Sequence, residues 1–154
     1  MEQGGTIANK TGKLLETFIE NLLIQKEYKY VQKKRFDSAT HMLDQPIYSK
    51  QYNVCTGIYD TPIRCDFIVF HPEKHPDRLI IESKWQQSSG SADEKYPYTI
   101  HNIKEKYPCD TVLVLDGDGY KKGAEKWVRD QVGEKLRHVF NMREFQKWVN
   151  QEGL

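Results

Sequence analysis

Two carboxylates and a lysine stand at spacings that could support hydrolytic chemistry. Asp66 interrupts the apolar run RCDFIVF, and Glu82-Ser83-Lys84 interrupts the next one, RLIIESKW. If these runs form an antiparallel hairpin in which Phe70 pairs with Arg78, Asp66 lies directly across from Glu82, with side chains roughly 5 Å apart. Carboxylates so close repel each other, and a divalent cation would remove that cost. Oxygen ligands of this kind favour Mg²⁺.

Lys84 follows Glu82 by two residues, so a strand places both side chains, and that of Gln86, on one face. A lysine there could stabilise hydroxide and the charge that develops on a phosphate, orient the attacking water, or act as the base. The alternative is a solvated face with a weak cross-strand ion pair. Apolar neighbours on both strands argue against that alternative, because unpaired charge is costly among them.

The first helix offers a third acid. Glu16 lies about 110° from the centre of the apolar stripe of this helix, whereas Glu20 lies about 150° away. Glu16 is therefore the acid nearer the buried boundary and could lean toward the sheet. Gly12, one turn earlier on the same flank, would permit the close approach of another backbone. The alternative is that Glu16 is an ordinary surface residue of the helix.

Two segments could contact a phosphate backbone. The stretch WQQSSGSADEKYPY after Lys84 is rich in small and hydrogen-bonding residues, and its candidate contacts are Gln87, Ser88, Ser91 and Lys95. The same stretch could also be a polar loop that leads into a helix capped by Ser91. A basic run interleaved with aromatic residues supplies Lys33, Lys34 and Arg35 as further candidates. As a solvated face, that run needs no function.

The pattern of apolar residues predicts an α/β fold in which a central mixed β-sheet is flanked by helices. Residues 37–51 carry little periodicity and are expected to form a loop, which is a candidate for reading bases. We expect helices at 10–29, within 92–106, at 121–137 and at 142–150; Thr11 would cap the first after a flexible lead-in, and Pro97 would lie near the first turn of the second or interrupt it. We expect strands at 52–59, 64–70, 78–85, 111–116 and 138–140. Residues 28–36 could be a strand or the end of the first helix, and we expect a turn at 71–77.

Length and composition indicate one domain spanning residues 1–154. The formal net charge is +1, so a polyanionic partner would have to be met by a local patch. Three cysteines without CxxC spacing argue against a disulfide framework or a zinc site. We see neither a signal peptide nor an apolar run of membrane-spanning length, and we therefore expect a cytoplasmic, soluble protein with no membrane partner.

Taken together, these motifs resemble those of the PD-(D/E)XK nuclease superfamily, which has the restriction-endonuclease-like fold. The resemblance covers roughly residues 10–130. It rests on Gly12-x-x-x-Glu16, Asp66, Glu82-Ser83-Lys84, and Gln86-x-x-x-Gly90-Ser91 followed by Glu94-Lys95. One departure is that Cys65, rather than a proline, precedes Asp66.

The resemblance implies a set of roles for these residues. Asp66 and Glu82 would bind Mg²⁺, with Mn²⁺ as a possible substitute, joined by the backbone carbonyl of Ser83. Glu16 would touch a metal directly or through water. Lys84 would assist the attacking water, and Gln86 would sit beside the scissile phosphate.

The expected function is hydrolysis of a DNA phosphodiester by metal-activated water. One active site cuts one strand, so site-specific cleavage of both strands of a duplex would need a homodimer or a higher homo-oligomer. A restriction enzyme or a homing endonuclease of phage or intron origin fits this size. The alternatives are a structure-specific or repair nuclease acting on DNA or RNA, and a nucleic-acid-binding module that has lost catalysis.

Overall fold

The computed structural model describes residues 4–86, 92–117 and 122–154. Helices and strands alternate along most of this chain. The elements are α1 (Gly4–Gln25), β1 (Lys29–Tyr30), α2 (Lys33–Met42), β2 (Ile47–Thr56), β3 (Pro62–His71), β4 (His75–Trp85), α3 (Ala92–Glu105), β5 (Thr111–Asp116), α4 (Lys122–Asp130), β6 (Leu136–Phe140) and α5 (Met142–Asn150).

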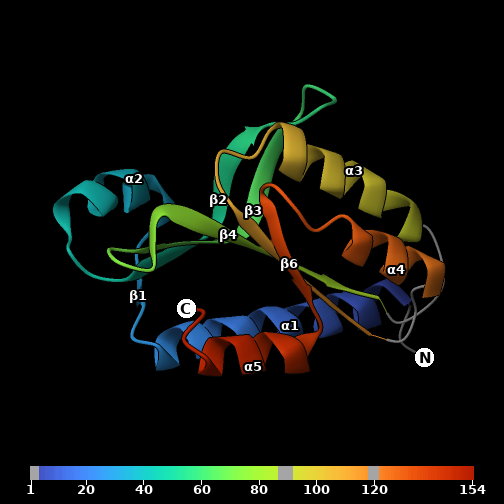
Figure 1. Ribbon diagram of the computed structural model, residues 1–154, viewed down its shortest axis with the longest axis horizontal. Helices are drawn as coiled ribbons and strands as arrows, with labels where there is room; N and C mark the ends of the chain where they lie inside the picture. The colour runs from blue at the N-terminus through green and yellow to red at the C-terminus, as the bar shows by residue number, and fades with distance from the viewer. Residues whose placement is uncertain (1–3, 87–91, 118–121) are drawn as a thin grey trace.

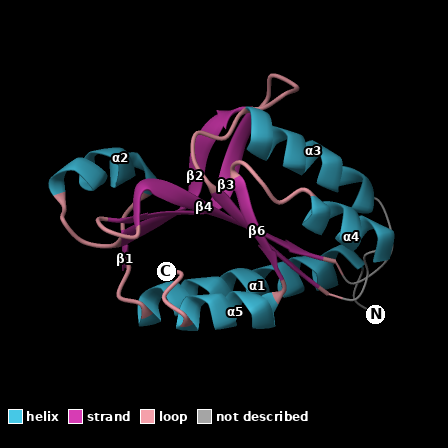
Figure 2. Ribbon diagram, viewed as in Figure 1, coloured by secondary structure: helices cyan, strands magenta, loops and turns pink. Residues whose placement is uncertain are grey.

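The strands in the described residues form one mixed sheet in the order β1-β2-β3-β4-β5-β6 (Figure 2). The middle strands β2, β3 and β4 run antiparallel, whereas β1 is parallel to β2, and β5 is parallel to both β4 and β6. Parallel neighbours need a crossover connection, and helices α2, α3 and α4 supply these crossovers. The mixed α/β sheet predicted from the sequence is confirmed.

Helices cover both faces of the sheet (Figure 1). Helices α1 and α5 lie on one face, and α2, α3 and α4 lie on the other. Alternate residues of β3 and β4 supply the two cores: Phe67 and Ile81 pack under α1, whereas Ile68 and Ile80 pack under α3. Strand β5 is buried on both faces from Thr111 to Leu115, as its continuous apolar sequence predicts.

Two helices differ from the sequence prediction near the N-terminus. Helix α1 begins at Gly4, so residues 4–10 are helical and Thr11 lies inside the helix instead of capping it. No proline occurs in this stretch to block a helical backbone. Helix α2 occupies residues 37–42 of the segment expected to be a loop, and β2 occupies residues 47–51. The buried residues of α2 are Phe36 and Ala39, and this apolar repeat is too sparse to produce a recognisable helical pattern.

The helix expected at 121–137 ends early, at Asp130. Val132 is 47% exposed, and Leu136 belongs to β6, where it pairs with Thr111. Gly133 stands between them, and glycine disfavours a continued helix. Pro97 lies within α3 without ending it. Among the described residues, no helix has the length and apolar character needed to cross a bilayer.

Strands β2, β3, β4 and β6 all start earlier than the sequence indicates, and the difference is largest for β2 and β4. Strand β2 begins at Ile47 rather than at residue 52, and β4 begins at His75, so the expected turn at 71–77 is shorter. His75 pairs with His71 across this turn. The second proline of the segment, Pro76, therefore lies at the start of a strand, where the lack of an N–H group is tolerated.

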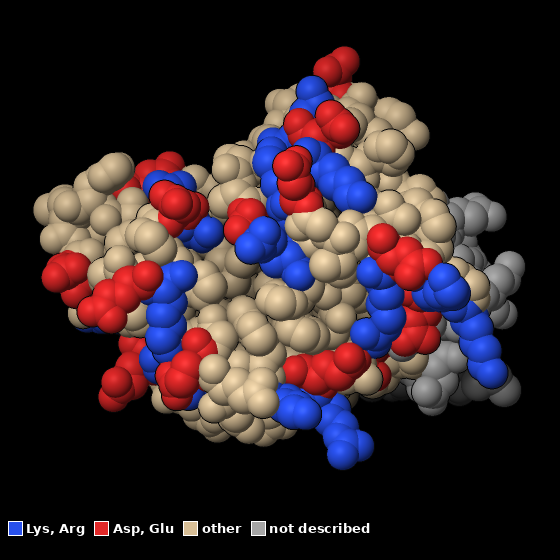
Figure 3. All heavy atoms as spheres, viewed as in Figure 1, with Lys and Arg blue, Asp and Glu red and all other residues tan. Residues whose placement is uncertain are grey.

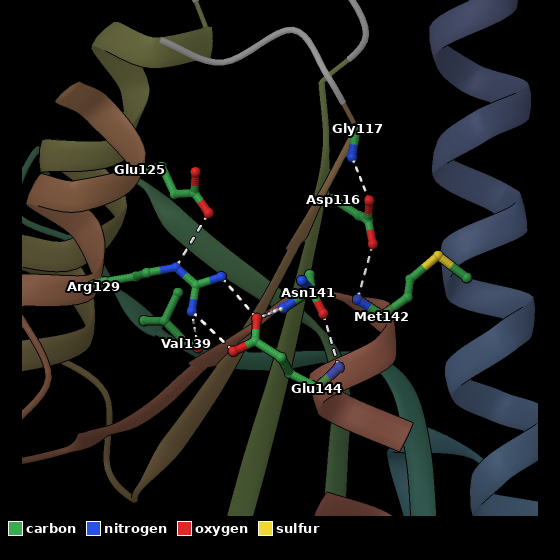
Figure 4. A network of polar contacts seen from close by, with 8 residues as sticks. All are labelled: Asp116, Gly117, Glu125, Arg129, Val139, Asn141, Met142 and Glu144. Atoms are coloured by element: carbon green, nitrogen blue, oxygen red, sulfur yellow. Dashed lines mark hydrogen bonds and ion pairs between the residues drawn. The ribbon is translucent and has the colours of Figure 1, made fainter. Parts of the chain in front are cut away.

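A polar network anchors the N-terminus of α5 to its neighbours (Figure 4). Arg129 of α4 donates to both carboxylate oxygens of Glu144, at 2.8 and 3.2 Å. Asn141 and Glu144 form a capping box, in which each side chain accepts from the backbone N–H of the other. Asp116, at the end of β5, accepts from the N–H of Met142 at 2.8 Å. These contacts fix α5 against the sheet edge formed by β5 and β6.

We predict that the Asn141→Ala substitution lowers the free energy of unfolding by about 1 kcal/mol, because it leaves a helix N–H without its acceptor. Urea denaturation followed by circular dichroism measures this change. Asn141→Ser keeps an oxygen acceptor and should retain most of the stability. An alanine variant as stable as the wild type would show that the cap contributes nothing.

Candidate active site

Strands β3 and β4 bring Asp66 next to Glu82. Their antiparallel register pairs Phe67 with Ile81, so the next step along the strands sets Asp66 opposite Glu82. Residues 67–69 of β3 keep the register assumed from the sequence, but the register shifts between Val69 and His71, so the assumed pair of Phe70 with Arg78 is not formed. The apolar residues beside the two acids lie in the cores, so the strands cannot separate the carboxylates without exposing core residues.

The regular alternation of side chains breaks at Asp66. Phe67 lies in the core under α1, whereas Cys65, two residues earlier, lies in the core under α3. Residues two apart in a regular strand share a face, so the backbone of β3 rotates at Asp66. Gln51 of β2 stands opposite Asp66, between regularly paired residues, and has a φ of 53°. The irregularity thus occurs in both strands at the position of the acid.

Ser83 holds the Asp66 carboxylate in place. Oδ2 of Asp66 accepts hydrogen bonds from the Ser83 backbone N–H at 2.8 Å and from the Ser83 hydroxyl at 3.1 Å. The N–H groups of Ile80 and Gln86 donate to Asp110 and Asp116, on the β5 side of β4. Successive residues of a strand direct their backbone groups to opposite neighbours, and Ser83 is three residues from each of these two. Its N–H and C=O therefore point toward β3. The Ser83 carbonyl is therefore an oxygen donor on the same edge of β4 as Asp66.

Glu82 is the most deeply buried acid of the site, with an exposed fraction of 4%. Burial, followed by the nearby Asp66 carboxylate, raises the pKa of Glu82 to about 8. Lys84 and a hydrogen bond from the Tyr107 hydroxyl, at 3.1 Å, oppose this shift by stabilising the charged form. Placing a charged carboxylate here is therefore costly unless a further positive charge offsets it.

Glu16 joins the acids from α1. Burial and the Asp66 carboxylate raise the pKa of Glu16, and three lysines, of which Lys50 acts most strongly, oppose the rise. Glu16 is partly buried on α1, as its position near the boundary of the apolar stripe predicts. Gly12 differs from expectation: a Cβ added there would meet nothing within 4 Å, so no described backbone packs closely against it.

Only a few groups near the two acids could bind a cation, and all of them are oxygen ligands, which hard cations prefer. Within the described ranges, no three His, Cys, Asp or Glu side chains form a cluster that could hold a metal ion. The candidate donors are the carboxylates of Asp66 and Glu82 and the carbonyl of Ser83, with Glu16 nearby. Mg²⁺ commonly binds through one or two carboxylates and keeps several waters, so this donor set fits it.

Lys84 and Gln86 both lie on the α3 side of β4, as the strand period predicts. The Lys84 side chain is exposed and lines a pocket of about 250 Å³ with residues of α3, including Lys95. Gln86 is 5% exposed, and its Oε1 accepts from the Tyr96 hydroxyl at 2.8 Å. The structure thus brings Lys84 to the surface beside the acids, whereas the amide of Gln86 is held inside.

Basic side chains at the start of α2 line a groove beside β2. Lys33, Lys34 and Arg35 form the first turn of this helix. Lys33 and Lys34 line a groove of about 460 Å³ together with Lys50 and Gln51. Gln51, which stands opposite Asp66 in the register of β2 and β3, is the lining residue nearest in register to the acids. Charges of both signs are interspersed over the molecular face in Figure 3, so bulk charge does not mark the interface.

Some predicted site residues are not among the described residues, and two residues near the site were not predicted from the sequence. Gln87, Ser88 and Ser91 fall outside the described residues, so their predicted contacts stay predictions. Sequence reasoning missed Lys50, because it lies in the segment assigned to a loop. It also missed Tyr107, which follows α3 and donates to Glu82. No local motif signalled this tyrosine, since the contact depends on how α3 crosses the sheet.

The fold and the acidic hairpin define a nuclease domain of the restriction-endonuclease-like class. The model of the PD-(D/E)XK nuclease superfamily domain matches residues 7–152, and the chain belongs to this superfamily. No curated protein and no solved structure matches the chain. Members of this superfamily generally use divalent metals and act on nucleic acids.

We predict that Glu82→Gln stabilises the cation-free protein, and does so more strongly as the pH rises. The folded state holds the Glu82 proton up to about pH 8, whereas an unfolded glutamate releases it near pH 4.5. Folding therefore becomes less favourable across this interval, and Gln removes the penalty. The gain in the free energy of unfolding should therefore be larger at pH 8 than at pH 5.

Urea denaturation in EDTA at pH 5 and at pH 8 measures the gain. Glu105→Gln, at an exposed position on α3, is the matched control and should leave stability unchanged at both pH values. Equal stability of wild type and Glu82→Gln at pH 8 would contradict the buried-charge account.

Proposed function

We propose that the protein is a Mg²⁺-dependent endonuclease that hydrolyses phosphodiester bonds of DNA, with Mn²⁺ as a possible substitute. The observation that carries this proposal is the enforced proximity of Asp66 and the buried Glu82. Two acids held together in a poorly solvated hairpin cannot both ionise without cost, and acids placed in this way are candidates for binding a ligand. The superfamily membership of the chain supplies the reaction class.

In this proposal, Asp66, Glu82 and the Ser83 carbonyl hold the cation, and Glu16 contributes directly or through water. A divalent cation bound there would polarise a phosphate oxygen and make water a better nucleophile. The hydrogen bonds from Ser83 fix the orientation of Asp66 beforehand, so little rearrangement is required.

Lys84 lies beside the acids with its ammonium group free to reach a phosphate. We assign it the stabilisation of negative charge on the reacting phosphate and the orientation of the attacking water. Gln86 is proposed to sit next to the scissile phosphate. Its buried hydrogen bond with Tyr96 also supports the end of β4 from which Lys84 projects.

The DNA is proposed to approach over the grooves on both sides of the acids. Lys33, Lys34 and Arg35 would contact phosphates on the α2 side, and Lys95 would do so on the α3 side. Gln87, Ser88 and Ser91 are proposed contacts on the basis of sequence alone.

Site-specific cleavage of both strands would use a homodimer or a higher oligomer, since each protomer carries one such site. The alternative is a nuclease that recognises DNA or RNA structure or damage, or a binding module without catalysis. A restriction or homing endonuclease would cleave site-specifically, whereas a repair nuclease would recognise nucleic-acid structure or damage. The pocket beside Lys84, whose wall carries tyrosines, favours recognition of structure.

We predict that the protein nicks supercoiled plasmid in Mg²⁺ and that EDTA abolishes nicking. Glu82→Gln and Lys84→Ala should each lower the rate by about 100-fold or more, because each removes stabilisation of transition-state charge. Agarose gel electrophoresis of time courses measures these rates. Lys126→Ala, on the exposed side of α4, is the control and should cut like the wild type. Undiminished nicking by Glu82→Gln would refute the assigned site.

A further inference from the structure

A pocket with aromatic walls adjoins the proposed catalytic lysine. It has a volume of about 250 Å³ and lies between the end of β4 and the first half of α3. A cavity of about 150 Å³ is known to accommodate benzene, so this pocket has room for a purine or pyrimidine ring. Its lining residues are Lys84, Trp85, Lys95, Tyr96, Tyr98 and Thr99.

Tyr98 extends this aromatic wall outward to the turn between β2 and β3. Its ring stacks on that of Tyr59, with centroids 4.8 Å apart and an interplanar angle of 24°. Tyr59 is 71% exposed, so most of its surface faces solvent. The stacked pair therefore forms a continuous aromatic surface from the tip of the turn to the pocket beside Lys84.

The turn that carries Tyr59 is fastened to α3. Asn102 of α3 is 2% exposed, and its Oδ1 accepts from the backbone N–H of Ile58 at 2.8 Å. A Cβ added at Gly57 would lie 2.8 Å from this same oxygen, so the approach depends on glycine. The Tyr59 ring is exposed although its turn is held in place by Asn102, so burial contributes little to its position. It is, however, already held in position for a planar ligand.

The charges around the pocket complement a nucleotide. Lys84 and Lys95 stand at its edge, where they can meet phosphates, while Tyr96 and Tyr98 supply apolar ring surface. Aromatic rings bind bases of any sequence by stacking, because every base has a planar face. A base inside a regular duplex is stacked on its neighbours and cannot reach such a pocket.

From this arrangement we propose that the pocket binds a single unstacked nucleobase, which lies against Tyr98 while its flanking phosphates contact Lys84 and Lys95. This inference rests on the proposed nuclease function and narrows its substrate to DNA with an extrahelical nucleotide beside the cleaved bond. The base is either already unpaired in the substrate or extruded by the protein, and the stacking chemistry is the same in both cases.

The test compares three fluorescently labelled duplexes in Ca²⁺ by anisotropy. One duplex is fully paired, one carries a single unpaired adenine, and one carries an abasic nucleotide at that unpaired position. Loss of the stacked base should weaken wild-type binding by about 5- to 150-fold, the range of stacking on one aromatic residue. Tyr98→Leu should bind the adenine and abasic duplexes alike, whereas Tyr98→Phe should keep the difference.

A further variant separates a stacking role from a folding defect. Tyr59→Leu changes an exposed ring and should reduce the adenine-to-abasic difference in part. If the wild type binds the fully paired duplex tightly and Tyr98→Leu does not, the protein extrudes the base from the duplex. Binding of that duplex no tighter than the abasic one would show capture of a base already unpaired.

Equal wild-type affinity for the adenine and abasic duplexes would overturn the inference. If the same preparation still nicks plasmid in Mg²⁺, the nuclease proposal stands while the base pocket falls. If a preparation shows Tyr98-dependent discrimination but no nicking, the pocket stands and the nuclease proposal falls.

Discussion

The electrostatic conflict between Asp66 and Glu82 is the constraint on which the site depends. Glu82 is almost completely buried, and its charge is disfavoured both by burial and by Asp66. The protein tolerates the conflict because β3 and β4 are fixed on both faces by apolar cores, so the strands cannot move apart at acceptable cost. Packing energy elsewhere in the sheet thus holds together two acids that cannot both ionise without cost.

The same hairpin needs a local irregularity to present its acid. Regular alternation would assign Asp66 to one face of β3 and Ser83 to the opposite face of β4, yet their side chains meet. The rotation of β3 between Cys65 and Phe67, matched by the positive φ of Gln51, brings the carboxylate to the edge of β4. A left-handed conformation in a non-glycine residue is strained, and such strain tends to concentrate at functional sites.

The sequence predicts this hairpin well and the surrounding helices less well. Strongly apolar strands such as β5 are recognisable locally, and a turn between two such strands sets the register of Asp66 against Glu82. Helix α2 is not recognised because its packing uses few apolar residues. Lys50 is missed because it lies in the first part of β2, which the sequence assigns to the same loop. The contact between Tyr107 and Glu82 arises from tertiary packing of α3, which no local pattern encodes.

A nearly neutral protein can bind a polyanion only through the placement of its charges. The acids would repel a phosphate backbone, while lysines on either side, such as Lys50 and Lys84, would attract it. Neutralising Asp66 and Glu82 with a divalent cation changes this balance in favour of the backbone, and a bound phosphate would in turn favour the cation. Affinity for the cation and affinity for the nucleic acid are then coupled, and thermodynamic linkage makes that coupling equal in both directions. The buried acidic pair would therefore act both as a ligand set and as a restraint on nucleic-acid binding until the cation is present.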